Sequence, residues 1–174
     1  ISLNPTENSV LLNHRIINRS IWNVTLAPWC LSVMAPGGRA IVPQEEFRPH
    51  PEYLLPARPL VLWHYTNMHD PRWTWGEKYI QLQQVPRAKT KQKVGLLNKQ
   101  GWGAYYLNGD LFVKRYACLP GQTYPDYGCN TELYTDQNML ELETLGPVTN
   151  ILPNGYVEHQ EKWYLFKAVL NKTE

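Results

Sequence analysis

The stretch that decides the fold is "WGAYYLNGDLFVKRYA", residues 102–117. Asn108-Gly109 is the dipeptide most typical of a two-residue type I′ turn, and it separates two runs rich in aromatic and β-branched residues. Such a turn joins neighbouring antiparallel strands. We therefore predict a β-hairpin whose strands cover 102–107 and 110–117.

The rest of the chain repeats this pattern of short apolar runs between turn residues. Further strands are predicted at 9–17, 20–27, 29–34, 39–42, 60–65, 78–84, 93–97, 131–135, 139–145 and 156–170. The five prolines within 43–59 predict a long surface loop, and no stretch has a capped, 3.6-periodic helical pattern. An all-β fold follows, an antiparallel β-sandwich or barrel formed by one domain over 1–174.

Composition narrows the classes of partner. A net charge of +2 is too small to predict binding to nucleic acid or to an anionic membrane. Seven Trp and eleven Tyr against three Phe is unusual, because rings with a polar handle suit half-wet surfaces. Sugars bind such surfaces, with C–H faces on rings and hydroxyls on polar neighbours. The alternative is that most of these rings fill the core.

The cysteines indicate neither a disulfide framework nor a cofactor. Cys30, Cys118 and Cys129 are far apart, and no CxxC or Cys/His motif predicts zinc. A bridge between Cys118 and Cys129 stays open. The start at Ile1, without Met, is read as N-terminal trimming. It leaves the compartment open, with periplasmic or secreted slightly favoured, and nothing indicates the oligomeric state.

"MLELETLGP" (139–147) places two carboxylates on one strand face, because side chains alternate along a strand and Glu141 and Glu143 are two apart. Glycosidases need two carboxyls about 5–9.5 Å apart across the bond that is cleaved. Neighbours on one strand point in parallel, so a single general base fits better than a glycosidase or lyase pair. The non-functional alternative is an exposed acidic face whose glutamates pair with Lys114 across the sheet.

His64 is the candidate general acid, since it ends an apolar strand beside a polar loop; the alternative is a structural histidine. Lys114 and Arg115 are adjacent, so one of them faces inward with the apolar residues. An inward cation needs an anionic partner, and the expected partners are Glu132, Glu141 and Glu143. Such a pair is either a buried salt bridge or half of a site.

Three segments together resemble an uncharacterised family related to the galactose mutarotases, over roughly residues 10–168. They are "INRSIWNVTLAPWCLSVMAPGG", "LFVKRYACLPGQTYPDYGCNTELYTDQNMLELETLGP" and "ILPNGYVEHQEKWYLF". The resemblance implies a large antiparallel supersandwich with a sugar-binding face, of which residues 1–174 are expected to form the C-terminal two-thirds. It also implies that Glu143, in the "LET" at 142–144, is the general base of an aldose 1-epimerase.

The epimerases' acid histidine lies in a motif like "NHSYFNL", and the nearest match here, "NRSIWNV" at 18–24, has Arg19 in its place. We therefore expect carbohydrate binding, with epimerase-like chemistry by Glu143 and His64 or a non-catalytic accessory module as alternatives. The expected sugar contacts, beside these two, are Glu141, Lys114, Arg115, Trp102, Tyr127 and Asn130.

Overall fold

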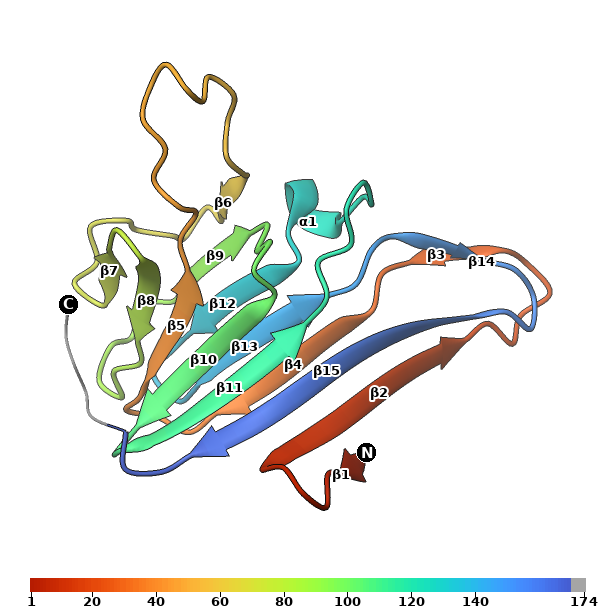
Figure 1. Ribbon diagram of the computed structural model, residues 1–174, viewed down its shortest axis with the longest axis horizontal. Helices are drawn as coiled ribbons and strands as arrows, with labels where there is room; N and C mark the ends of the chain where they lie inside the picture. Colours follow the sequence, from red (N-terminus) through yellow and green to blue (C-terminus); the bar gives the residue numbers. More distant parts are fainter. Residues whose placement is uncertain (170–174) are drawn as a thin grey trace.

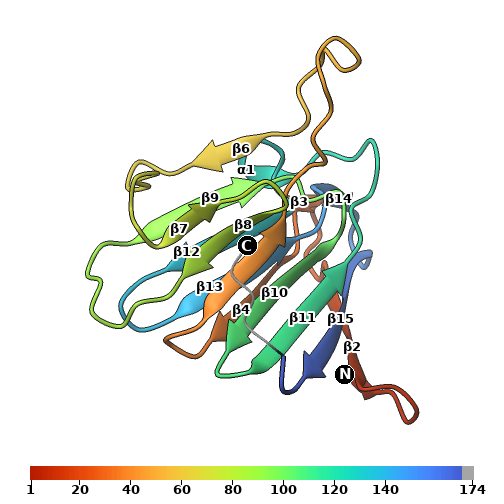
Figure 2. The ribbon, with the colours of Figure 1, turned by 60° about the vertical axis from the view of Figure 1, so that its left-hand side comes forward.

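The computed structural model describes residues 1–169 and contains two large antiparallel sheets (Figures 1 and 2). The large sheet has the strand order β1 (Ser2–Leu3), β2 (Ser9–Ile17), β15 (Tyr156–Phe166), β11 (Asp110–Tyr116), β10 (Trp102–Leu107), β5 (Arg39–Pro43), β8 (Tyr79–Gln83) and β7 (Trp73–Trp75). The small sheet has the order β4 (Trp29–Met34), β13 (Leu140–Leu145), β12 (Thr131–Thr135), β9 (Gln92–Leu96) and β6 (Leu60–Leu62). A separate ribbon pairs β3 (Val24–Leu26) with β14 (Thr149–Ile151).

The two sheets pack face to face, so the fold is sandwich-like and not a barrel. One core cluster joins Val42, Leu82 and Tyr105 of the large sheet to Leu133 and Leu142 of the small sheet. These side chains occupy alternate positions along their strands, as expected when one face of a sheet is buried. The predicted all-β sandwich is confirmed at this level.

The predicted hairpin is confirmed in register. Leu107 pairs with Asp110, and both turn residues have positive φ, 51° at Asn108 and 89° at Gly109, as a type I′ turn requires. The runs at 9–17, 29–34, 102–107 and 131–135 are strands with the predicted bounds.

Other predicted strands are shorter than expected. The run at 20–27 contains only β3, 60–65 contains only β6, and the last strand ends at Phe166, while residue 170 of that prediction lies outside the described part. β1, β7 and β14 were not predicted, because two or three residues carry no measurable alternation.

Two connections reach the end of the sandwich where β6 lies (Figure 1). The proline-rich segment between β5 and β6 is a long loop, as predicted, and it projects away from both sheets. Near it lies α1 (Pro125–Gly128), whose Asp126 and Tyr127 have left-handed φ values of 49° and 59°. This segment is therefore a strained turn and not a regular helix.

β13 shows the predicted alternation. Leu140 and Leu142 are buried in the core, so Glu141 and Glu143 face away from it, on the outer face of the small sheet. Glu143 is nevertheless fully buried. Something must cover it on that face.

Candidate functional site

Three charged side chains meet on the outer face of the small sheet. Glu143 on β13 is the cross-strand partner of Glu132 on β12, and Lys93 comes from the adjacent strand β9. The Lys93 Nζ lies 2.7 Å from Glu132 Oε2 and 3.1 Å from Glu143 Oε1. One ammonium thus bridges two carboxyls that point to the same side of the sheet.

Two tryptophans cover this group. The Trp29 indole donates a hydrogen bond to Glu143 Oε2 at 2.7 Å. The Lys93 Nζ lies over both rings, 5.5 Å from the Trp29 centroid and 4.8 Å from the Trp63 centroid. We call Trp29, Trp63, Lys93, Glu132 and Glu143 the Lys93 cluster.

Gly95 makes room for the second ring. It lies two residues after Lys93 on the same face, and a Cβ there would come within 3.1 Å of the Trp63 ring and 2.6 Å of Cys129 Sγ. The Trp63 ring therefore packs directly against the Gly95 backbone. Trp29 is 55% exposed, so one wall of the cluster borders solvent.

The charge balance of the cluster perturbs its titration. Burial raises the pKa of Glu132 to about 8, against the opposing effect of Lys93. Burial alone would lower the pKa of Lys93, but its contacts with Glu132 and Glu143 outweigh burial and raise it. Glu132 shares its single neighbouring ammonium with another carboxyl, and its burial therefore favours the protonated form.

Glu132 Oε1 supports this protonation. It is buried and has no hydrogen-bond partner, and the nearby Asp126 side chain raises the pKa of Glu132 further. Two neighbouring carboxylates repel each other, which favours the protonated form of one of them. The strained turn of α1 therefore holds an acid against a second acid, as is typical of functional sites.

A cleft of about 300 Å³ adjoins the cluster. It is lined by Val61, Leu62, Trp63, His64, Asp126 and Tyr127. Trp63 belongs both to the wall of the cleft and to the cluster, and Asp126 in the wall lies near Glu132. The cleft and the buried charges therefore form one continuous site. The volume is at the lower end of that of small-ligand pockets.

Four of the predicted site residues lie in this region. Glu143 lies in the cluster, His64 and the 91% exposed Tyr127 line the cleft, and Glu141 is half-buried on the same face of β13. Burial and then the neighbouring Glu143 raise the pKa of Glu141. Residues from three separate parts of the sequence therefore meet here.

The other four lie elsewhere. Trp102 and Arg115 are cross-strand neighbours on the outer face of the large sheet. Asn130 is fully buried, where its side chain donates to the Asn98 carbonyl at 3.1 Å and accepts from the Asn98 amide at 2.6 Å, a structural role. Lys114 lies between the two sheets.

Lys114 is the inward-facing cation that the sequence predicts, but the prediction of its partners was wrong. Its Nζ pairs with Glu161 Oε1 at 2.8 Å, and not with Glu132, Glu141 or Glu143. The reason is the pleat: the glutamates of β12 and β13 point out of the sandwich, whereas Glu161 on β15, beside β11, points in. Glu141 and Glu143 do not form the exposed acidic face of the non-functional alternative either, because Glu143 is buried.

Sequence reasoning missed Lys93 and the two tryptophans. Lys93 ends the basic run "RAKTKQK" (87–93), which predicts a solvated hairpin tip. Arg87, Lys89 and Lys91 are exposed as expected, but Lys93 already belongs to β9 and is buried. The period of two along β9 was the available signal, since it places Lys93 opposite to Val94.

Comparison of the chain with protein-family models, with curated proteins and with solved structures finds no match. Within residues 1–169 the three cysteines are free, so Cys118 and Cys129 are not bridged. None of the helical structure in the described residues is long and apolar enough to cross a membrane.

Proposed function

We propose that this protein binds a carbohydrate on the outer face of the small sheet, at the Lys93 cluster and its cleft. The observation that carries the proposal is the seating of two tryptophan rings beside fixed charged groups at a solvent border. Aromatic faces stack against the C–H faces of sugars, and carboxyl, ammonium and indole groups can bond to hydroxyls. The finer fold assignment, a galactose mutarotase-like supersandwich, is part of this proposal.

The side chains of the Lys93 cluster already bond to one another, and these contacts hold the cluster in a fixed arrangement. Glu143 accepts from Lys93 and from Trp29, and Lys93 lies over both rings. The free capacity for a ligand lies at the rim, at His64, Asp126 and Tyr127 in the cleft and at the exposed part of Trp29. The contacts within the cluster orient the tryptophan rings, and the cleft residues supply hydrogen bonds to a ligand.

A second candidate function is aldose 1-epimerase-like chemistry, and the state of Glu132 favours it. Anomer exchange needs one group that gives a proton and one that takes it. With a pKa of about 8, Glu132 holds a proton at neutral pH beside a second carboxyl, Glu143. A carboxyl that holds its proton at neutral pH is suited to act as a general acid. His64, at the cleft, is the alternative acid.

Isothermal titration calorimetry of wild type and variants with a panel of mono- and oligosaccharides tests binding. Trp63→Ala and Trp29→Ala are each expected to weaken binding by about 2- to 13-fold, since aromatic stacking is worth roughly 0.5–1.5 kcal/mol. Trp102→Ala is the matched control, because Trp102 is a partly exposed tryptophan on the other sheet. Equal losses in all three variants, or no binding of any sugar, contradict the proposal.

The catalytic candidate is tested separately by NMR of α/β-anomer equilibration. Glu132→Gln and Glu143→Gln are expected to abolish any acceleration over buffer, while Glu158→Gln, an exposed glutamate on β15, leaves it intact. Binding without acceleration in the wild type assigns the accessory-module function instead.

A further inference from the structure

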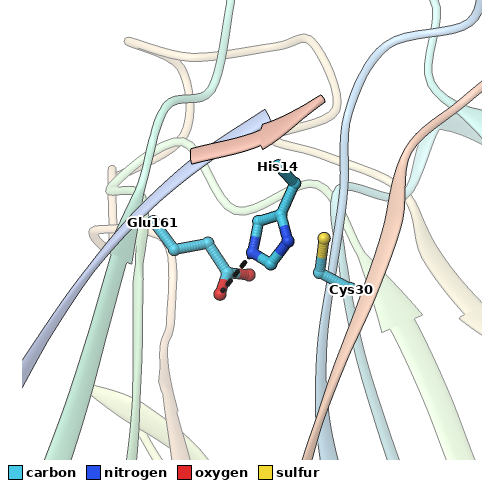
Figure 3. A group of neighbouring side chains, drawn as sticks. All are labelled: His14, Cys30 and Glu161. Atoms are coloured by element: carbon cyan, nitrogen blue, oxygen red, sulfur yellow. Dashed lines mark ion pairs between the residues drawn. The ribbon is translucent and has the colours of Figure 1, made fainter. Parts of the chain in front are cut away.

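A second cluster lies between the two sheets, far from any sequence motif. His14 on β2, Cys30 on β4 and Glu161 on β15 each contribute one ligand atom, and these atoms lie within 4.8 Å of one another. Figure 3 shows the His14 imidazole between the Glu161 carboxylate and the Cys30 thiol. The three strands belong to both sheets, so the group lies where the edge strand β4 faces β2 and β15.

We propose that His14, Cys30 and Glu161 form a binding site for a divalent transition metal, with Zn²⁺ the best fit. Imidazole, thiolate and carboxylate together select zinc over the hard cations Ca²⁺ and Mg²⁺, which take oxygen ligands. Three protein ligands leave a fourth position for water. This site is independent of the carbohydrate proposal, because it uses the opposite face of the small sheet.

The distances are close to those of a metal site. With ligand bonds of about 2.0–2.3 Å and tetrahedral angles, neighbouring ligand atoms are separated by roughly 3.3–3.6 Å. The His14 Nε2 lies 3.7 Å from Glu161 Oε2. The remaining separations are all within 4.8 Å, so metal binding needs the ligand atoms to close by up to roughly 1.2–1.5 Å.

The unused hydrogen-bonding capacity of His14 is the independent sign of a ligand. Its Nε2 is buried and has no hydrogen-bond partner in the structure. A buried polar nitrogen without a partner is costly, and an approaching metal ion would satisfy it. The remainder of the His14 side chain is 38% exposed, which gives an ion a path from solvent.

Glu161 is already oriented as a metal-binding carboxylate. Its Oε1 accepts from the Thr144 hydroxyl and pairs with the Lys114 ammonium, while its Oε2 accepts from the Trp163 indole at 3.0 Å and faces His14. An oxygen with two lone pairs can hold the indole and a metal together. Such outer contacts fix metal ligands in known sites.

Metal binding changes the charge of this group. Zn²⁺ with the Cys30 thiolate and the Glu161 carboxylate is neutral, and the Lys114 ammonium on the far oxygen, Oε1, leaves one net positive charge on the whole group. Burial raises the pKa of the metal-free Cys30 thiol to about 11, so binding at neutral pH releases its proton.

The test uses untagged full-length protein, stripped of metal with a chelator and titrated with Co²⁺ as a spectroscopic probe. One equivalent of Co²⁺ is expected to give a thiolate-to-cobalt charge-transfer band that Zn²⁺ removes. Cys30→Ser abolishes the band, and His14→Gln weakens Zn²⁺ binding at least tenfold. Cys118→Ser, a half-buried free cysteine elsewhere, is the matched control and keeps both.

Circular dichroism of the metal-free variants establishes that they fold, and His14→Gln, at a partly exposed position, carries the test if Cys30→Ser does not. Zn²⁺ is expected to raise the thermal midpoint of wild type and not of His14→Gln. The absence of a charge-transfer band in wild type, or a band that persists in Cys30→Ser, overturns the proposal.

Discussion

The Lys114–Glu161 pair gives the sharpest test of how this sandwich is held together. Both side chains are at most 1% exposed, and the Lys114 Nζ also donates to the Leu142 carbonyl at 3.1 Å, across the two sheets. Lys114→Met keeps the length and apolar stem of the side chain and removes its charge. The variant leaves the Glu161 carboxylate buried without its cation.

The cost of an uncompensated buried charge gives the magnitude. Removal of one partner from a buried ion pair costs about 3–5 kcal/mol. Burial alone would raise the pKa of Glu161, but contacts with His159 and Lys114 lower it, from 4.5 to about 2. The whole shift corresponds to about 3 kcal/mol at neutral pH, and Lys114 supplies part of it. We expect a loss of about 3–5 kcal/mol, or about 6–20 °C in the thermal midpoint.

The pH dependence has a defined sign. A carboxyl whose pKa is lowered by folding adds stability above its unfolded pKa of 4.5, and this contribution is lost as the pH falls toward about 2. Wild type should therefore lose stability over this acid range. In Lys114→Met the pKa of Glu161 rises, so the variant loses less between pH 4.5 and 2, and the two stabilities converge.

The assay is urea unfolding followed by tryptophan fluorescence at several pH values. Lys162→Met is the matched control, since Lys162 is the neighbour of Glu161 on β15 and pairs with Glu7 at 2.6 Å on the exposed surface. An exposed pair contributes about 0–1 kcal/mol. The double variant Lys114→Met/Glu161→Gln should recover part of the loss, because it removes the orphaned charge. The reasoning is refuted if Lys114→Met costs no more than Lys162→Met.

Three further predictions rest on single contacts. Glu132→Gln should flatten the decline in stability between pH 4.5 and 8. The decline arises because the folded wild type keeps a proton on Glu132 up to about pH 8, whereas the unfolded chain releases it near 4.5. Urea unfolding at pH 5 and 8.5 measures this, and an equal decline in wild type and variant contradicts it. Gly101→Ala should cost at least about 1–3 kcal/mol, because φ is 64° and a Cβ would overlap the Tyr116 carbonyl oxygen; a thermal midpoint equal to that of Gly109→Ala, whose turn has open space, would argue against the overlap. Tyr116→Phe should lower the free energy of unfolding by about 1–3 kcal/mol, since the Tyr116 hydroxyl accepts from the Asn98 side-chain amide and bonds the Thr131 hydroxyl. An unchanged denaturation midpoint would contradict that role.

The local parts of the fold were readable from the sequence. Asn108-Gly109 defines its own hairpin, and the alternation in "MLELETL" correctly places Glu141 and Glu143 on one face, because both signals need only adjacent residues. The partner of Lys114 could not be read in this way. Glu161 is 47 positions away, and only the register of β11 against β15 brings the two together.

Both candidate sites failed to appear as motifs for the same reason. Trp29, Trp63 and Lys93 come from separate parts of the chain, and the burial of Lys93 depends on rings that lie 64 and 30 positions before it. His14, Cys30 and Glu161 have no metal-ligand spacing, so the absence of a CxxC pattern in the sequence says nothing about them. Sites that are assembled by strand order leave no local signature.

The position of β13 explains why there are two charged clusters and not one. Its outward residue Glu143 bonds Lys93, while its inward residue Thr144 bonds Glu161 and its Leu142 carbonyl bonds Lys114. A carboxylate and a lysine on opposite faces of one sheet cannot satisfy each other, so each lysine takes the acid on its own side. The strand thus separates a solvent-bordering cluster, where a ligand can reach the rings, from an interior cluster that joins the two sheets. Chemistry proposed for Glu143 therefore has to come from outside the sandwich, whereas metal binding at Cys30 acts between the sheets.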